Sequence, residues 1–464
     1  MTDPRQSILP EMTIPHADHG LERAIGVRGL AATAFNVTVG GGIFVIPAVV
    51  AATIGPSAPV AYIVVAAAMG LIVLCFAQAG SRVSLTGGPY AYVEIALGKY
   101  VGFLTGTLLW LVGTTATAAV GSALVGSIAV FWAPLAQPIP RALILALVFA
   151  LFGALNIRGT RQSTRFLEMI TVVKLLPLIL FIVVGAALAH GPVPNVFGTL
   201  EPARLGRSVI VLIFAFAGIE FALVPSGEVK DPARTVPRAL FIAMSAITIL
   251  YVAIQYVAQL ILGPQLALEQ AAPLTAAARA IAGSGGAVFI GVCASISMFG
   301  YVSGMTLAAP RALWKFADEG LLPKRLGVIH VRFRTPHVAI IVQSLLVTSL
   351  AVFHSFEQLA VIANLAALLL YAAVAVATLV LRRRDVRHDG ASPFRVPGGP
   401  LVPVLTVALI AWLLTSITPT EWAALVATLM VATFFYAVRS RLAGPGPSPL
   451  RAIDDNAVRH PGPT

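Results

Sequence analysis

Long apolar stretches alternate with short polar connections along most of the chain. Between residues 29 and 438 many uncharged runs reach the roughly 20 residues that a helix needs to cross a bilayer. This pattern predicts an all-α integral membrane protein. We expect twelve spanning helices, at about 28–52, 59–82, 99–133, 141–158, 165–189, 207–227, 237–262, 285–316, 336–354, 358–381, 400–417 and 421–438.

Composition and charge agree with this pattern. Hydrophobic residues make up 58% of the 464 residues and charged residues only 11%, whereas soluble domains carry about 25% charged residues. Of the 31 Lys and Arg, 26 fall in the even-numbered connections and the tails, which predicts that both termini are cytoplasmic. The net charge of +12 then reflects orientation and contact with the cytoplasmic leaflet of the cell membrane, so we expect no nucleic-acid partner.

One transmembrane domain is expected to occupy almost the whole chain. It covers residues 27–440, between a cytoplasmic N-terminal tail (1–26) and a flexible cytoplasmic C-terminal tail (441–464). The eleventh and twelfth helices lie at about 400–438. Cys75 and Cys293 both fall inside spans and are expected to be buried thiols. The chain has no Walker motif and no set of side chains with metal-ligand spacing, so we expect neither an enzyme nor a cofactor or metal.

Two of the expected helices contain signals that interrupt a helix. The first reads "VGGGIFVIP" at 39–47, and the sixth reads "FAFAGIEFALVPSGE" around Gly218 and Glu220. Glycines also permit close helix packing in lipid, which is the structural alternative. Broken helices in the first and sixth places fit two inverted repeats of five spans, at about 27–190 and 205–383. This arrangement is typical of secondary transporters that bind substrate at the bilayer midplane.

Such breaks expose backbone groups with a specific chemistry. A restarting helix presents unpaired N–H groups and a positive dipole end, which suit a carboxylate. These are the amides around Gly40, Gly41, Gly42 and Ile43. A helix that stops presents carbonyl oxygens that accept from an ammonium, here those of Thr38, Phe214 and Ala217. The two sets together predict an α-amino acid as the small-molecule substrate.

Five segments in order resemble the amino acid–polyamine–organocation (APC) superfamily of amino acid permeases. They read "GGGIFVIP", "GGPYAYVEIALGKYVGFLTG", "TVVKLLPLILFIVVG", "FAFAGIEFALVPSGEVKDPARTVPRAL" and "LAAPRALWKFADEGLLP". The resemblance implies a LeuT-type fold with ten core helices and two peripheral ones. It also implies the carboxylate and amine contacts given above. Where the family often has Ser or Thr in the first motif, this chain has Gly41, so a hydroxyl contact to substrate is missing.

Similarity of position also implies which side chains line the pocket. They are Val112, Gly113, Thr117, Gly218, Tyr301 and Met305, with Phe214 as an aromatic lid. None of these side chains is charged, which favours neutral L-amino acids over arginine, lysine or polyamines.

Two ionisable residues fall deep within the spans and are candidates for coupling. Lys174 lies about 15 Å into the fifth helix, where an ammonium is expected to pair with carbonyls or to titrate. Permeases that this chain resembles carry a lysine where sodium-coupled relatives bind the cation, with Ser303 and carbonyls near Gly40 as expected partners. Glu220 is a candidate proton site, gate partner to a hydroxyl or carbonyl, or counter-charge for a cationic substrate. A structural hydrogen-bonding role is the alternative.

We therefore expect a sodium-independent, proton-coupled amino acid symporter. An amino acid exchanger of the same fold, including one for cationic amino acids or amines, is the alternative. A non-transporting amino acid sensor is a more distant one. The sequence does not predict an oligomeric state.

Overall fold

The computed structural model describes residues 23–158, 164–191, 193–196, 201–318, 320, 322–387 and 392–443. Nearly all of the two expected tails, 1–26 and 441–464, therefore lies outside the described residues. Within them the chain is all-helical, apart from one parallel bridge between Ile25 and Val229. The α-helices are α1 (Val27–Thr38), α2 (Gly42–Ile54), α3 (Ala58–Arg82), α4 (Pro89–Leu97), α5 (Lys99–Ala129), α6 (Pro138–Arg158), α7 (Thr164–Leu188), α8 (Pro202–Phe216), α9 (Ile219–Ala222), α10 (Pro232–Leu262), α11 (Pro273–Asp318), α12 (His337–Phe353), α13 (Phe356–Arg383), α14 (Leu401–Leu414) and α15 (Pro419–Ala443). Five short 3₁₀ helices are Gly55–Ser57, Ala133–Ala136, Ser226–Glu228, Gly263–Leu268 and Lys324–Gly327.

These helices have the length and apolar character of a multi-pass membrane protein. Eight stretches of the described chain are long and apolar enough to cross a bilayer, and three shorter apolar helices accompany them. Helix α6 carries large apolar side chains on its outside at every fourth position, namely Leu143, Leu147, Leu151 and Leu155. Such an apolar stripe on an outer surface is suited to contact with lipid.

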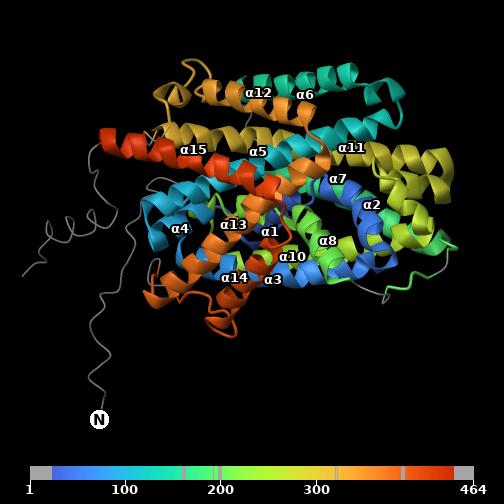
Figure 1. Ribbon diagram of the computed structural model, residues 1–464, viewed down its shortest axis with the longest axis horizontal. Helices are drawn as coiled ribbons and strands as arrows, with labels where there is room; N and C mark the ends of the chain where they lie inside the picture. The colour runs from blue at the N-terminus through green and yellow to red at the C-terminus, as the bar shows by residue number, and fades with distance from the viewer. Residues whose placement is uncertain are drawn as a thin grey trace, which may run out of the picture.

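Burial separates the central helices from the peripheral ones. The apolar part of α5 is 94% buried, whereas that of α15 is only 11% buried. Figure 1 shows α6 and α12 together along one edge of the bundle and α1 near its centre. Helix α5 packs against α4, α11, α12 and α13, so it forms one wall of the interior.

The first and the sixth expected spans each consist of two helices. Helix α1 ends at Thr38 and α2 begins at Gly42. Helix α8 ends at Phe216 and α9 begins at Ile219. The two interrupted pairs contact each other, through α2 with α8 and through α1 with α9.

Two helical segments were not expected from the sequence. Helix α4 lies in the connection between the second and third expected spans, bracketed by Gly88 (φ 54°) and Gly98 (φ 93°) and started by Pro89. Proline at the first position and glycine just beyond the end are ordinary helix boundaries. The eighth expected span, 285–316, is preceded by a further helical segment from Pro273. It is separated from the span by Gly283, whose φ of 63° and ψ of −153° bend the chain.

Candidate substrate site between two interrupted helices

The first interruption leaves the start of α2 with unpaired backbone donors. Val39 N–H donates to the Phe35 carbonyl, and Gly40 N–H donates to the Thr38 carbonyl at 2.8 Å. Phe44 N–H donates to the Gly41 carbonyl at 3.1 Å. No partner within the described residues is recorded for the next amides in the series, which are those of Gly41, Gly42 and Ile43. These amides stand at the positive end of the α2 dipole.

Packing around the break requires glycine at two positions. A Cβ atom at Gly40 would lie 2.8 Å from the Tyr301 ring, and one at Gly42 would lie 3.1 Å from the Ala215 Cα atom. Backbone of α2 therefore approaches backbone of α8 directly. Gly41 faces α5 and α11, where its Cβ would lie 3.0 Å from Val120.

The second interruption is built around Gly218. Ala217 is extended, and Gly218 has a φ of 126°, a region that side chains rarely allow. A Cβ there would lie 2.5 Å from the Val37 carbonyl oxygen. The Gly218 N–H donates to Glu220 Oε2 rather than to the Phe214 carbonyl four residues earlier. The Phe214 carbonyl therefore lacks its usual intrahelical donor.

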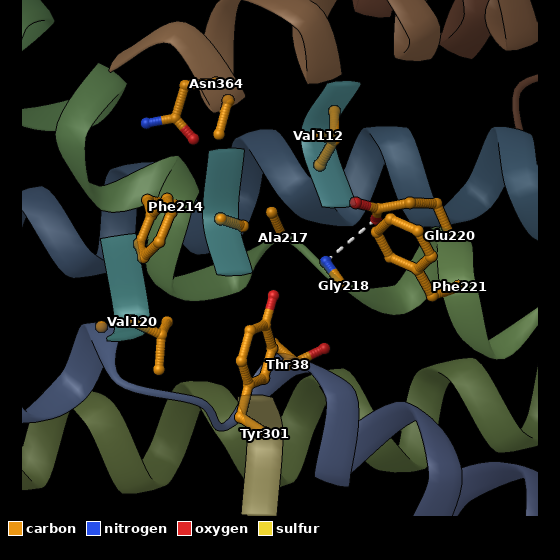
Figure 2. A pocket seen from close by; sticks show the side chains of 13 residues that line it. Thr38, Val112, Val120, Phe214, Ala217, Gly218, Glu220, Phe221, Tyr301 and Asn364 are labelled. Carbon is orange, nitrogen blue, oxygen red and sulfur yellow. Dashed lines mark hydrogen bonds between the residues drawn. The ribbon is translucent and has the colours of Figure 1, made fainter. Parts of the chain in front are cut away.

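A cavity lies where the two interruptions meet, as Figure 2 shows. The space that it offers to water is small, about 20 Å³. Its walls come from both interrupted helices and from α5, α11 and α13. They consist of Thr38, Gly42, Val112, Ala116, Val120, Phe214, Ala217, Gly218, Glu220, Phe221, Tyr301, Ala363 and Asn364.

Eight residues predicted for the site lie on this wall. They are Thr38, Gly42, Val112, Phe214, Ala217, Gly218, Glu220 and Tyr301. Gly40, Gly41 and Ile43 belong to the same break but not to the wall itself.

Three further predicted residues, Gly113, Thr117 and Met305, lie behind the wall. A Cβ at Gly113 would lie 3.1 Å from both Met305 and Phe221, so Met305 packs against α5. The Thr117 hydroxyl donates to the Gly113 carbonyl within its own helix.

The Thr38 carbonyl already has two donors. In addition to Gly40 N–H, the Tyr251 hydroxyl of α10 donates to it at 3.4 Å. Its capacity for a substrate ammonium is correspondingly smaller. The Thr38 hydroxyl oxygen, in contrast, is buried and has no hydrogen-bond partner among the described residues. Open acceptors near the break therefore include this hydroxyl and the Phe214 carbonyl.

Glu220 is fully buried on the cavity wall. Its Oε2 atom accepts from Gly218 N–H and from the Tyr371 hydroxyl, both at 3.0 Å. Its Oε1 atom has no partner in the described part of the chain. One carboxylate oxygen therefore accepts hydrogen bonds from Gly218, between α8 and α9, and from Tyr371 of α13. The other oxygen is free to accept a further hydrogen bond.

Lys174 lies beside the first interruption rather than on the cavity wall. Its side chain is 3% exposed. The Nζ atom donates to the carbonyls of Asn36 at 3.4 Å and Val39 at 3.3 Å. Val39 directly precedes Gly40, and Asn36 lies one helical turn earlier in α1. Within the described residues, Lys174 does not make the expected hydrogen bond to Ser303. Lys174 therefore joins α7 to the end of α1.

Sequence reasoning missed the contribution of α13 and part of α5 to the wall. Ala116, Val120 and Ala363 are small or apolar and carry no signal of their own. Asn364 did carry a signal, since a buried amide in an apolar span is a candidate functional residue. Its Nδ2 atom donates to the Ile210 carbonyl at 2.6 Å, and its Oδ1 atom has no partner among the residues described.

Comparison with known proteins identifies the family of the chain. A family model described as amino acid permease matches residues 25–447. The chain is 26% identical over 452 residues to the methylthioribose transporter of Bacillus subtilis, with 94% of this chain and 97% of the relative covered. It is 26% identical to the serine/threonine exchanger SteT of the same species, with 84% and 90% covered.

A third relative from Bacillus subtilis is the branched-chain amino acid permease BcaP, which is 25% identical with 94% and 97% covered. The family match spans most of the chain and confirms the resemblance found from the sequence motifs. The protein is therefore a transporter and belongs to the amino acid permease family of the APC superfamily.

Proposed function

We propose that this protein is a secondary active transporter that takes up neutral L-amino acids across the cell membrane. The observation that carries the proposal is the meeting of two interrupted helices at one cavity. Unpaired amides at the start of α2 adjoin this cavity, and the open acceptors beside Thr38 and Phe214 lie on its wall. The amides bind the substrate carboxylate and the acceptors bind its ammonium.

The fold that we propose for this function is of the LeuT type. Twelve membrane crossings are assigned, with α1–α2 as the first and α8–α9 as the sixth, and both termini are cytoplasmic. Residues 27–190 and 205–383 form two inverted repeats, and α14 and α15 are peripheral. The observed helix bounds and the low burial of α15 support this assignment.

We propose that Lys174 makes transport sodium-independent and takes part in proton coupling. Its ammonium donates hydrogen bonds to carbonyl oxygens beside the first interruption, where a cation would otherwise bind. Loss or gain of a proton at Lys174 would change its hold on α1, and so couple protonation to the position of this helix.

An exchanger is the alternative function, and one observation favours it. One relative of similar length is named a serine/threonine exchanger. Other relatives are named cationic amino acid transporters, and one is named a methylthioribose transporter. The experiment must therefore separate net uptake from exchange and must include substrates of these classes.

Uptake into proteoliposomes tests the proposal. Purified protein is reconstituted with and without internal amino acid, and labelled amino acids are offered in sodium or choline buffer, with or without an inward proton gradient. We expect uptake into empty vesicles that is driven by the proton gradient and is equal in both buffers. Uptake that requires internal substrate would establish the exchanger instead. Uptake that requires sodium and ignores the proton gradient would contradict the coupling.

A further inference from the structure

Glu220 has the only carboxylate on the cavity wall formed by the described residues. Its Oε2 atom accepts two hydrogen bonds, which fix the carboxylate plane. Its Oε1 atom is buried and has no partner in this part of the chain. A buried acceptor without a donor is costly, so this atom calls for a donor from outside the protein.

The open oxygen lies away from the end of the cavity that suits a carboxylate. Gly41, at the start of α2, adjoins Val120 of α5, whereas Phe221, next to Glu220, adjoins Gly113 of the same helix. Figure 2 shows Val120 at one end of the cavity and Val112 with Glu220 at the other. Eight residues of α5 correspond to about 12 Å. A molecule whose carboxylate binds at α2 therefore directs its side chain toward Glu220.

None of the described residues on the wall supplies a cation to Glu220. The wall contains no Lys, Arg or His. The ammonium of Lys174 donates to carbonyls of Asn36 and Val39 instead. The donor that completes Glu220 is therefore expected on the substrate.

We infer that the transported amino acid carries a hydrogen-bond donor on its side chain, and that Glu220 Oε1 accepts this bond. The inference rests on the proposed function and specifies the side chain of its substrate. A cationic donor would replace the neutral substrate class with a cationic one. Hydroxyl, amide and ammonium groups share this chemistry. Apolar side chains such as that of valine do not have it, and they leave Oε1 without a partner when they displace water from the cavity.

Matched pairs of amino acids test the inference on the unmodified protein. Threonine and valine have nearly the same shape and differ in the hydroxyl, and lysine and norleucine differ in the terminal ammonium. Dissociation constants are measured for all four by calorimetry in detergent. We expect the donor-bearing member of at least one pair to bind at least about tenfold more tightly than its partner. A preference within the threonine–valine pair indicates a neutral donor, and one within the lysine–norleucine pair indicates a cationic donor.

The Glu220→Gln variant tests whether Glu220 Oε1 is the atom that causes the preference for donor-bearing substrates. Gly218 N–H and the Tyr371 hydroxyl both need an oxygen acceptor, so the glutamine oxygen takes the Oε2 place. The NH₂ group then takes the Oε1 place and turns an acceptor into a donor. We expect the preference for the donor-bearing substrate to fall below about threefold. Glu357→Gln makes the same change at an exposed position of α13 and should leave the preference intact.

Each outcome decides one claim. Equal binding within both pairs, or a preference that survives in Glu220→Gln, overturns this inference and leaves the proposed function standing. Failure of every amino acid to bind the wild-type protein overturns the proposed function as well. The comparison on wild-type protein does not depend on the stability of any variant.

Discussion

Gly218 lies at one of the close contacts between the two interrupted helices. Its φ of 126° is accessible to glycine and rare for other residues, and a Cβ would lie 2.5 Å from the Val37 carbonyl oxygen. Backbone on both sides leaves little room for adjustment. Gly218→Ala is expected to lower the free energy of unfolding by about 2 kcal/mol or more. It is also expected to abolish substrate binding.

Thermal unfolding and ligand binding of the purified variant check this prediction. Gly126→Ala in α5 is the matched control, because a Cβ there meets nothing within 4 Å and the backbone is helical. A Gly218→Ala protein with wild-type melting temperature and affinity would mean that the close approach at this residue is unimportant.

Lys174 acts at the same scale, through a single ammonium. Lys174→Met keeps the apolar stem but leaves the carbonyls of Asn36 and Val39 without this donor. We expect proton-driven uptake to fall at least about tenfold, since a buried charge at a midplane site is a functional group. The measurement is initial uptake in proteoliposomes with and without a proton gradient. Lys324→Met, at an exposed position, is the control. Undiminished proton-driven uptake by Lys174→Met would refute the role in coupling.

At the scale of elements, the C-terminal ends of α3 and α13 are joined by a small ionic cluster. Arg82 of α3 is 3% exposed and donates to Asp385 at 3.2 Å and to the Val386 carbonyl at 3.0 Å. Arg387 also donates to Asp385. The hydrogen bonds from Arg387 and Arg82 lower the pKa of the Asp385 carboxyl below its ordinary value.

The lowered pKa of the Asp385 carboxyl determines how the stability of the fold changes with pH. The ion pairs stabilise the fold above the unfolded pKa of about 3.9, and this contribution is lost as pH falls through the lower folded pKa. Asp385→Asn should lower the melting temperature by about 1–3 °C at pH 7 and by less at pH 3. Asp385 has a φ of 46°, which asparagine also tolerates.

Asp231→Asn is the control for this cluster. Asp231 has a similar φ of 41°, and its ion pair with Arg234 is exposed on both sides and longer, at 3.8 Å. We expect no measurable change from it at either pH. An equal effect of the two substitutions would show that the α3–α13 junction contributes nothing specific.

The interruptions of helices could be predicted from the sequence because their causes are local. The consecutive glycines Gly40–Gly42 at the start of α2 and Gly218 before α9 lower the local helix propensity. Helix α4 was missed although Pro89 and Gly98 mark its ends, because it lies in an expected connection.

The cavity wall could be predicted only in part. Ala116 and Asn364 reach it through the packing of α5 and α13, which are about 240 residues apart in sequence, and no local pattern reports such a contact. The position of Glu220 on the wall could not be predicted for the same reason. It depends on hydrogen bonds from Gly218 and from Tyr371 of the distant helix α13.

At the scale of the whole molecule, the arrangement serves one purpose. Helices α3, α7, α10, α11 and α13 pack against the two interrupted helices. Helices α6 and α15 lie outside and expose apolar side chains to lipid. A central cavity enclosed by a bundle in this way can open to either side of a membrane only if the surrounding helices move relative to the interrupted ones. This is the alternating access that we propose for transport.

The central claim is that the backbone ends of two interrupted helices bind the carboxylate and ammonium of an amino acid. The most direct test compares the affinity of the best-binding amino acid with those of its methyl ester and its N-acetyl derivative. Each derivative removes one charge and keeps the side chain. The account predicts that either change weakens binding by about 100-fold or more, because charge-assisted hydrogen bonds to the α2 amides or to the acceptors near Thr38 are lost. Binding of the ester or the N-acetyl derivative as tightly as the parent amino acid would contradict it.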